Sequence, residues 1–361
     1  MKSPLMAHLP AIEPRRARRR APTDPRIPPI APTLTRTAPL VRPPALHLAG
    51  VPRVAVVSLL ALAAVSAVVA PLATYATTLA VFGLPHVVQE MRYIRHRFAG
   101  WVGLWLVPVA VLLAAICAGR LAMLFDLLDP SIGRVVELGL AAALVLAVAP
   151  AWARGGLLSI ATGLLLTTGL VLGLLFAPIW ALLAIAVLHN WTPVPFVLEA
   201  SRRADRSLVL AACALVFLVV PGLIATGLPW ELATALGLGA PEWSLLDAGT
   251  LTANLRAYLP DIITGLPAAQ HIFSAIVFAQ CTHYVMILLV LPSLSGPAGR
   301  LRTPAWTWVG IVAISIVITA VFLVDFRFGR AFYGAFAAVH AWIEVPLFLL
   351  VLAAVRAPSA D

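Results

Sequence analysis

The sequence predicts an all-α bundle of membrane-spanning helices, and three observations carry that prediction. Of the 361 residues, 61% are hydrophobic and only 11% are charged, whereas soluble domains carry about 25% charged residues. Apolar stretches of about 20 residues recur along the chain, which is the length that crosses a hydrocarbon core of roughly 30 Å. From Val54 to Glu90 the chain is almost uncharged over 37 residues. A water-soluble fold is therefore excluded.

Ten spans are predicted within residues 51–356, which form a single transmembrane domain. Pro71 is expected to divide the long uncharged stretch into two spans with a tight turn between them; the total is nine if this pair is one tilted helix. The spans cover about residues 54–70, 73–91, 101–119, 135–152, 157–176, 179–198, 207–227, 271–292, 306–324 and 331–354. A loop at about 228–270 separates the seventh span from the eighth.

Residues 1–50 are predicted to be a disordered cytoplasmic tail. They contain eleven prolines and a cluster of arginines at 15–20, and such a composition cannot bury a core. No apolar segment follows the cluster, so the tail does not have the pattern of a secretory signal peptide. Nine Lys and Arg stand against Glu13 and Asp24 here, which places +7 of the net charge of +10 in the tail. The basic charge therefore does not indicate a nucleic-acid partner.

The positions of the arginines predict the orientation of the spans, because cytoplasmic loops carry an excess of Lys and Arg. With the tail in the cytoplasm, ten arginines fall in inside loops and five in outside loops. The inside set is Arg92, Arg95, Arg97, Arg154, Arg202, Arg203, Arg206, Arg300, Arg302 and Arg356, and the outside set is Arg120, Arg134, Arg256, Arg327 and Arg330. We therefore expect a multi-pass protein of the plasma (inner) membrane, with both termini cytoplasmic and the loop at 228–270 outside.

Common catalytic motifs are not present in the sequence. It has no phosphate-binding glycine loop and no Gly-x-Ser-x-Gly motif. The three cysteines, Cys117, Cys213 and Cys281, are scattered in apolar segments, so we interpret them as small core residues rather than as a disulfide framework.

The residues expected to carry function are the few ionisable ones inside the predicted spans, because such residues are costly in a bilayer. Two His-x-x-x-Glu pairs occur, and a spacing of four places both side chains on one helix face. Together with two single histidines they form a set of nitrogen and oxygen donors that suits iron, manganese or zinc. The predicted metal ligands are His86, Glu90, His189, His283, His340 and Glu344.

The predicted topology brings these residues together. They lie in the second, sixth, eighth and tenth spans, which all run from the outside to the cytoplasm, and at a similar depth in each. Scattered structural histidines would have no reason to share a direction and a depth, so one common site is favoured. Four further residues are expected to contact and orient the ligands without binding the metal themselves: Tyr93, Asn190, Gln280 and Tyr284.

Alternative interpretations of the same residues remain. A single histidine in a membrane helix is more often a hydrogen-bond partner between helices than a ligand. Glu90 could instead pair with Arg92, Arg95 or Arg97 at the membrane surface. A haem bundle would use paired histidines but would leave the carboxylates unexplained. A proton-coupled transporter could use the glutamates and histidines as a relay, and this is the second class of function that the sequence admits.

The segment Gly83-Leu84-Pro85-His86-Val87-Val88-Gln89-Glu90 resembles the signature of the Brp/Blh family of membrane β-carotene 15,15'-dioxygenases. That signature is Gly-x-Pro-His with a carboxylate four residues after the histidine; Glu90 stands where the family has aspartate, and Met91 where it has histidine. The resemblance covers about eight residues. It implies an apolar multi-span enzyme that uses iron (Fe2+) to cleave a carotenoid or a similar apolar small molecule taken from the lipid bilayer, and another transition metal is compatible with the same donors.

Overall fold

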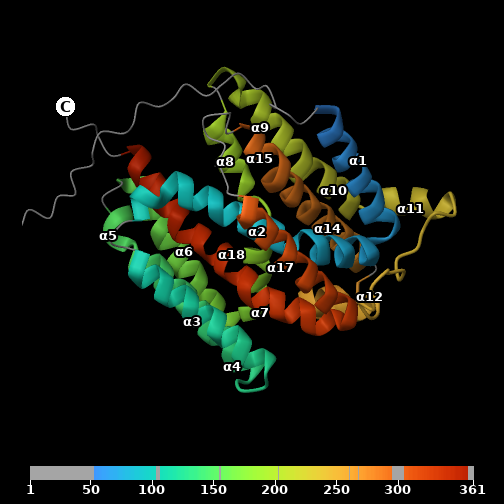
Figure 1. Cartoon of the computed structure of the whole chain (residues 1–361), viewed down its shortest axis with the longest axis horizontal. Coiled ribbons are helices and arrows are strands. Elements are labelled where there is room, and N and C mark those ends of the chain that lie inside the picture. Colours follow the sequence, from blue (N-terminus) through green and yellow to red (C-terminus); the bar gives the residue numbers. More distant parts are fainter. Residues whose placement is uncertain are drawn as a thin grey trace, which may run out of the picture. The chain divides into compact units, whose positions relative to one another are not determined.

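The computed structural model describes residues 53–102, 106–153, 156–201, 203–259, 261–266, 268–294 and 305–356. Within these ranges the chain forms helices and connecting turns and no strand (Figure 1). The all-α prediction is therefore confirmed. The predicted tail, residues 1–50, lies outside the described ranges.

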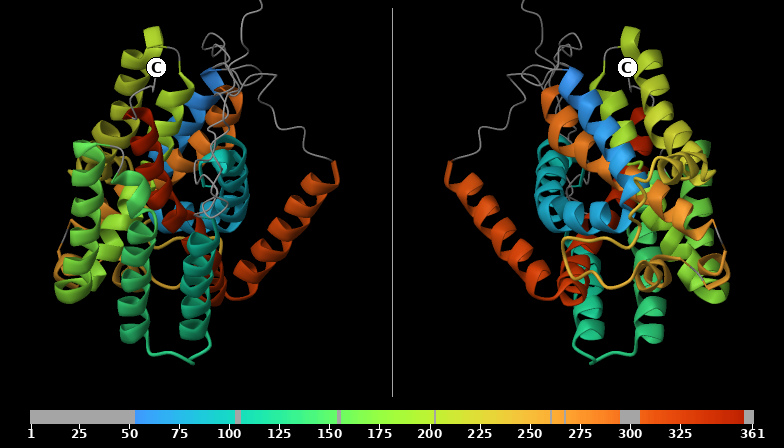
Figure 2. Two further views of the ribbon diagram at one scale, coloured as in Figure 1. Left: turned by 90° about the vertical axis from the view of Figure 1, so that its left-hand side faces the viewer. Right: turned by 90° about the vertical axis from the view of Figure 1, so that its right-hand side faces the viewer.

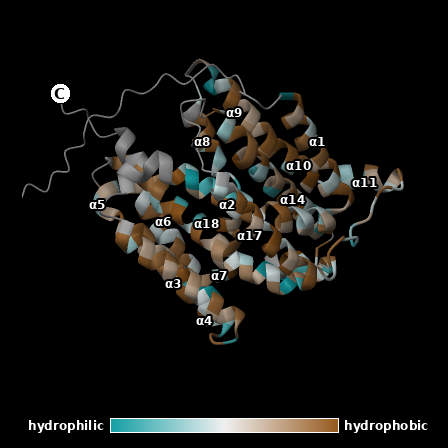
Figure 3. Cartoon of the chain, viewed as in Figure 1, coloured by the Kyte–Doolittle hydropathy of each residue, from teal (hydrophilic) through white to brown (hydrophobic). Residues whose placement is uncertain are grey.

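Within the described chain, eight helical segments are long and apolar enough to cross a membrane. They are Pro71–Ile94, Val107–Leu124, Pro130–Ala147, Leu157–Phe176, Pro178–Leu198, Arg206–Ala225, Ala269–Leu294 and Phe326–Leu350. Two shorter apolar helices, Arg53–Val69 and Val309–Val324, coincide with the first and ninth predicted spans. These segments support an integral, multi-pass membrane protein, whereas the count of ten and the orientation stay predictions. Figure 3 shows the apolar residues that these helices present.

The helices follow one another in this order: α1 (Arg53–Val69), α2 (Pro71–Val102), α3 (Leu106–Leu124), α4 (Pro130–Ala147), α5 (Ala149–Trp152), α6 (Leu157–Phe176), α7 (Pro178–His189), α8 (Pro193–Ala200), α9 (Arg206–Ala214), α10 (Val220–Ala225), α11 (Leu228–Ala235), α12 (Leu251–Tyr258), α13 (Asp261–Thr264), α14 (Ala269–Val285), α15 (Leu291–Leu294), α17 (Ala305–Val324) and α18 (Phe326–Arg356). Two π-helical turns, Leu215–Val219 and Met286–Val290, connect α9 to α10 and α14 to α15.

Prolines set several of the helix starts. Pro71, Pro130, Pro178 and Pro193 each begin a helix, where the missing N–H group is not needed and the fixed φ angle suits the first turn. The division of the long uncharged stretch at Pro71 is therefore confirmed.

Two predicted segments differ in detail from the structure. The sixth span, predicted as one helix over 179–198, is broken between α7 and α8 by residues 190–192. The loop at 228–270 contains the short helices α11, α12 and α13. The π-helical turn after α14 directly follows the segment of His283 and Tyr284, and such turns are often found at functional sites.

Helix α18 contacts several other helices of the described bundle and contributes to all three of its apolar clusters. It packs against α2, α3 and α17, while α3 and α4 form an antiparallel hairpin that also contacts it (Figure 2). The three apolar clusters of the core each contain a residue of α18, namely Tyr333, Trp342 and Leu347. Helices α14 and α18 both pack against α2, so α2 is a direct neighbour of two of the other three helices that carry predicted ligands.

Candidate metal centre

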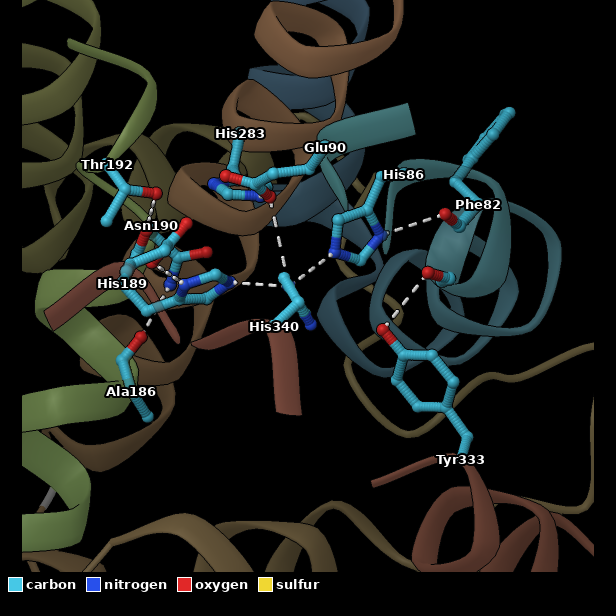
Figure 4. Close-up of polar contacts among 12 residues, drawn as sticks. Phe82, His86, Glu90, Ala186, His189, Asn190, Thr192, His283, Tyr333 and His340 are labelled. Atoms are coloured by element: carbon cyan, nitrogen blue, oxygen red, sulfur yellow. Dashed lines mark hydrogen bonds and ion pairs between the residues drawn. The ribbon is translucent and has the colours of Figure 1, made fainter. Parts of the chain in front are cut away.

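Five buried or nearly buried side chains converge on one point of the bundle. They are His86 and Glu90 of α2, His189 of α7, His283 of α14 and His340 of α18, and their donor atoms all lie within 4.8 Å of one another (Figure 4). This group, called the donor cage below, could hold a metal ion. It contains five of the six predicted ligands, brought together from positions as far as 254 residues apart.

The spacing of three ring nitrogens is that of ligands on a single ion. His340 Nε2 lies 3.3 Å from His86 Nε2 and 3.1 Å from His189 Nε2. A metal–nitrogen bond of about 2.1 Å places neighbouring ligands about 3.0 Å apart in octahedral and about 3.4 Å apart in tetrahedral geometry. The observed distances fall within that interval.

The four imidazole rings form a closed circuit. The ring centroids of His86 and His283 are 5.2 Å apart, those of His283 and His189 4.8 Å, those of His189 and His340 4.7 Å, and those of His340 and His86 5.1 Å. The carboxylate of Glu90 lies beside this circuit, with Oε2 at 3.5 Å from His283 Nε2 and 3.9 Å from His340 Nε2.

Hydrogen bonds to the far side of two rings bear on which nitrogen carries the proton. His86 Nδ1 lies 3.0 Å from the carbonyl oxygen of Phe82, which can only accept, so Nδ1 is protonated. His189 Nδ1 lies 2.8 Å from Glu344 Oε2 and donates to it when that carboxyl is ionised. In that state both rings turn a bare Nε2 lone pair toward His340 Nε2. A single proton on His340 can satisfy only one of them, whereas a cation accepts both.

Three members of the donor cage have unsatisfied polar atoms. Both oxygens of Glu90, both ring nitrogens of His283 and Nδ1 of His340 are completely buried and make no hydrogen bond of regular geometry within the described part of the chain. The side chain of Glu344 lies close enough to interact with that of Glu90. Glu90 is 0% exposed and His283 1%. Burial of unpaired polar or charged groups is strongly unfavourable, so these atoms fit a bound cation.

Glu344 lies outside the donor cage, although the sequence places it among the ligands. Its Oε2 accepts the hydrogen bond from His189 Nδ1, which orients the ring and raises the basicity of its other nitrogen. The backbone at the end of α7 is held as well, because Thr192 Oγ1 donates to the carbonyl oxygen of His189 at 2.8 Å.

The four predicted supporting residues differ in their contacts. The ring of Tyr284 packs against that of His86, with centroids 4.4 Å apart. Asn190 Nδ2 donates to the carbonyl oxygen of Ala186. Gln280 Nε2 is buried and has no hydrogen-bond partner in the described chain. The ring of Tyr93 packs against Phe196, at a centroid distance of 5.3 Å.

The proposed pairing of Glu90 with the surface arginines is not seen among the described side chains. Arg92 Nη1 donates to Gln89 Oε1 at 3.5 Å, and the carboxylate of Glu90 lies against the imidazoles and the side chain of Glu344. The side chains of Arg95 and Arg97 lie outside the described residues.

Sequence reasoning missed a third buried carboxylate, Glu137 of α4. Arg120 donates to it from Nε at 2.9 Å and from Nη2 at 2.6 Å, and Trp342 Nε1 donates at 2.8 Å. Arg120 Nη1 also donates to the carbonyl oxygen of Gly334 at 3.0 Å. Arg120 therefore lies within α3 and not in an outside loop. The only signal in the sequence was a glutamate inside the fourth predicted span.

Comparisons of the chain with models of known protein families, with curated proteins and with solved structures give no match. The resemblance of residues 83–90 to the Brp/Blh signature stays a prediction.

Proposed function

We propose that this chain is an integral membrane oxygenase that holds non-haem iron (Fe2+) in the donor cage and acts on an apolar lipid or carotenoid-like substrate. The observation that carries the proposal is the convergence of His86, His189 and His340. The Nε2 atoms of His86 and His189 face that of His340 at 3.3 and 3.1 Å. With Glu344 ionised both are bare, an arrangement that a bound cation stabilises.

The number and type of donors favour iron over structural zinc. Structural zinc is bound by four ligands in tetrahedral geometry, with thiolates in most sites. The donor cage offers four imidazoles and one carboxylate, and the three cysteines are free and outside it. Five donors leave one position open in an octahedral arrangement, and mixed nitrogen and oxygen donors suit non-haem iron or manganese.

The protein side of the mechanism follows from the contacts. Phe82 and Glu344 orient His86 and His189 so that Nε2 faces the cage, and Glu90 supplies one negative charge beside the four imidazoles. A bound iron ion would supply the one-electron chemistry that dioxygen requires. Burial excludes water from the reacting groups. The side chain of His189 is 14% exposed, against 0–3% for Glu90, His283 and His340, so the cage is least covered at α7.

Metal analysis of the purified full-length protein tests the proposal. We expect about one iron per chain, lost in His86→Ala and His340→Ala and retained in His271→Ala, which removes a histidine packed beside Gly227 and outside the cage. Size-exclusion profiles and thermal unfolding would establish that each variant is folded. Wild-type protein that is stable and binds neither iron nor another transition metal would refute the proposal. Oxygen consumption on addition of a carotenoid would then test the substrate class.

One observation favours a proton-coupled transporter as the second candidate. Glu344, His189, His340 and His86 form a continuous series of contacts of 2.8, 3.1 and 3.3 Å, as a proton relay would. A transporter predicts substrate-dependent proton flux in liposomes that is abolished by Glu90→Gln and unaffected by a metal chelator. An iron enzyme predicts no such flux and a strict requirement for metal.

A further inference from the structure

The turn of α2 that precedes Pro85 accepts side-chain hydrogen bonds beside the donor cage. Pro85 has no N–H group, so the carbonyl four residues earlier, that of Val81, loses its helical donor. The next two carbonyls along the helix each accept a bond from a side chain. His86 Nδ1 donates to the carbonyl oxygen of Phe82, and the hydroxyl of Tyr333 donates to that of Gly83 at 3.1 Å (Figure 4).

The hydrogen bond from Tyr333 connects two of the helices that carry ligands. Tyr333 lies on α18, seven residues before His340, which is about two turns and places both on the same face. Gly83 lies three residues before His86 on α2, one turn away on the same face. This hydrogen bond thus connects the turn of α2 that carries His86 to α18, which carries His340. The Nε2 atoms of these two histidines are 3.3 Å apart.

The fit between Tyr333 and α2 depends on glycine at position 83. A Cβ atom there would lie 3.1 Å from Tyr333 Cζ and 3.2 Å from Cε2, closer than ordinary van der Waals contact. Tyr333 has little room to retreat, since it is 8% exposed and its ring packs against that of Phe322, with centroids 6.3 Å apart. A side chain at position 83 would therefore displace the phenol ring by a few tenths of an ångström, because the ring lies directly against the helix backbone.

We propose that Tyr333 is a positioning residue, which holds the Pro85 turn of α2 against α18 and so sets the separation of His86 and His340 for the metal. The inference rests on the proposed metal centre. Tyr333 binds no metal itself and acts through the backbone of Gly83.

Tyr333→Phe tests this role, because it keeps the ring and removes only the donor. Thr319→Val is a matched control: Thr319 Oγ1 of α17 donates to the carbonyl oxygen of Ala80 at 2.9 Å, also on α2 but outside the Pro85 turn. Both variants lose one side-chain hydrogen bond to an α2 carbonyl. Gly83→Ala provides a second variant that displaces Tyr333 by a different route.

Co2+ titration of the full-length protein against a competing chelator gives affinity, and the visible absorption of bound Co2+ reports its geometry. We expect Tyr333→Phe and Gly83→Ala to weaken Co2+ binding about tenfold and to shift the absorption bands, whereas Thr319→Val leaves both unchanged. A Tyr333→Phe protein with wild-type affinity and spectrum, or a Thr319→Val protein weakened equally, would overturn the inference while leaving the metal centre intact. If Tyr333→Phe does not fold, Gly83→Ala decides by the same criteria. Wild-type protein that binds no Co2+ would overturn the metal centre itself.

Discussion

Replacing Glu344 by glutamine separates the two roles that a carboxylate can have at this centre. Glu344 Oε2 accepts a hydrogen bond from His189 Nδ1 at 2.8 Å, whereas Glu90 belongs to the donor cage. In Glu344→Gln the amide fills the same volume and its oxygen can still accept, but the charge that strengthens the bond is lost. The metal ligands themselves remain.

The loss of metal affinity should therefore be smaller in Glu344→Gln than in Glu90→Gln. Loss of a residue that orients a ligand lowers metal affinity roughly 10- to 100-fold. Because the amide still accepts, we expect the lower end for Glu344→Gln, about tenfold or about 1.4 kcal/mol. For Glu90→Gln we expect more than about 100-fold, because a donor atom and the negative charge beside the cation are lost together.

Competition titration with Fe2+ or Co2+, together with the metal content per chain, measures both variants. Glu242→Gln is the matched control. Glu242 also accepts a hydrogen bond from a nitrogen, Leu251 N at 2.7 Å. It lies between α11 and α12 and is not a member of the donor cage. It should bind metal as the wild type does. Equal losses in Glu344→Gln and Glu90→Gln would show that Glu344 is a ligand and would refute the assignment made from the geometry.

Three further outcomes are expected. Glu137→Ala should destabilise the folded protein by about 3 kcal/mol, because it leaves the charge of Arg120 without its partner; unfolding in mixed micelles measures this, and a loss below about 1 kcal/mol would contradict it. Deletion of one residue within 286–290 should convert the π-helical turn to α-helix and rotate His283 by about 100° relative to the residues that follow. The metal content should then fall in protein that still elutes as a folded species, and unchanged metal content would argue against a role for that turn. Removal of bound metal should lower the thermal unfolding temperature, since a ligand at 1,000 times its Kd adds about 4 kcal/mol of stability; identical unfolding of metal-free and loaded protein would show that the cage does not bind the ion in the folded state.

The elements that the sequence predicted are those with a local physical signature. Pro71 ends one helix and starts the next because proline lacks an N–H group, and apolar length identifies most of the remaining spans. The break after His189 was not predicted, because the segment Pro178–Leu198 keeps a high mean hydropathy across the turns at residues 190–192. Pro193, which begins α8, was the local signal for it. Mean hydropathy measures how apolar the side chains of a segment are and does not report its backbone hydrogen bonds.

The two His-x-x-x-Glu pairs show how far spacing can determine a site. In both pairs the spacing places histidine and glutamate on one helix face, and the structure brings both histidines into the donor cage. The glutamates nevertheless differ: Glu90 reaches the cage, while Glu344 lies behind His189. Spacing fixes the face, whereas the distance from the common centre depends on how α2 and α18 pack against α7 and α14.

The contrast between Glu90 and Glu137 explains why burial alone does not identify a functional carboxylate. The two are almost equally buried, at 0% and 4% exposed. The oxygens of Glu137 accept three hydrogen bonds from Arg120 and Trp342, so its charge is compensated by the protein. The oxygens of Glu90 accept no hydrogen bond of regular geometry from the described residues, and another carboxyl, that of Glu344, lies close to them. A buried carboxylate that the fold leaves uncompensated is stable only with a proton or a cation. A second carboxyl beside Glu90 requires one of the two, and the imidazole donors of the cage are the ligands that a cation would use.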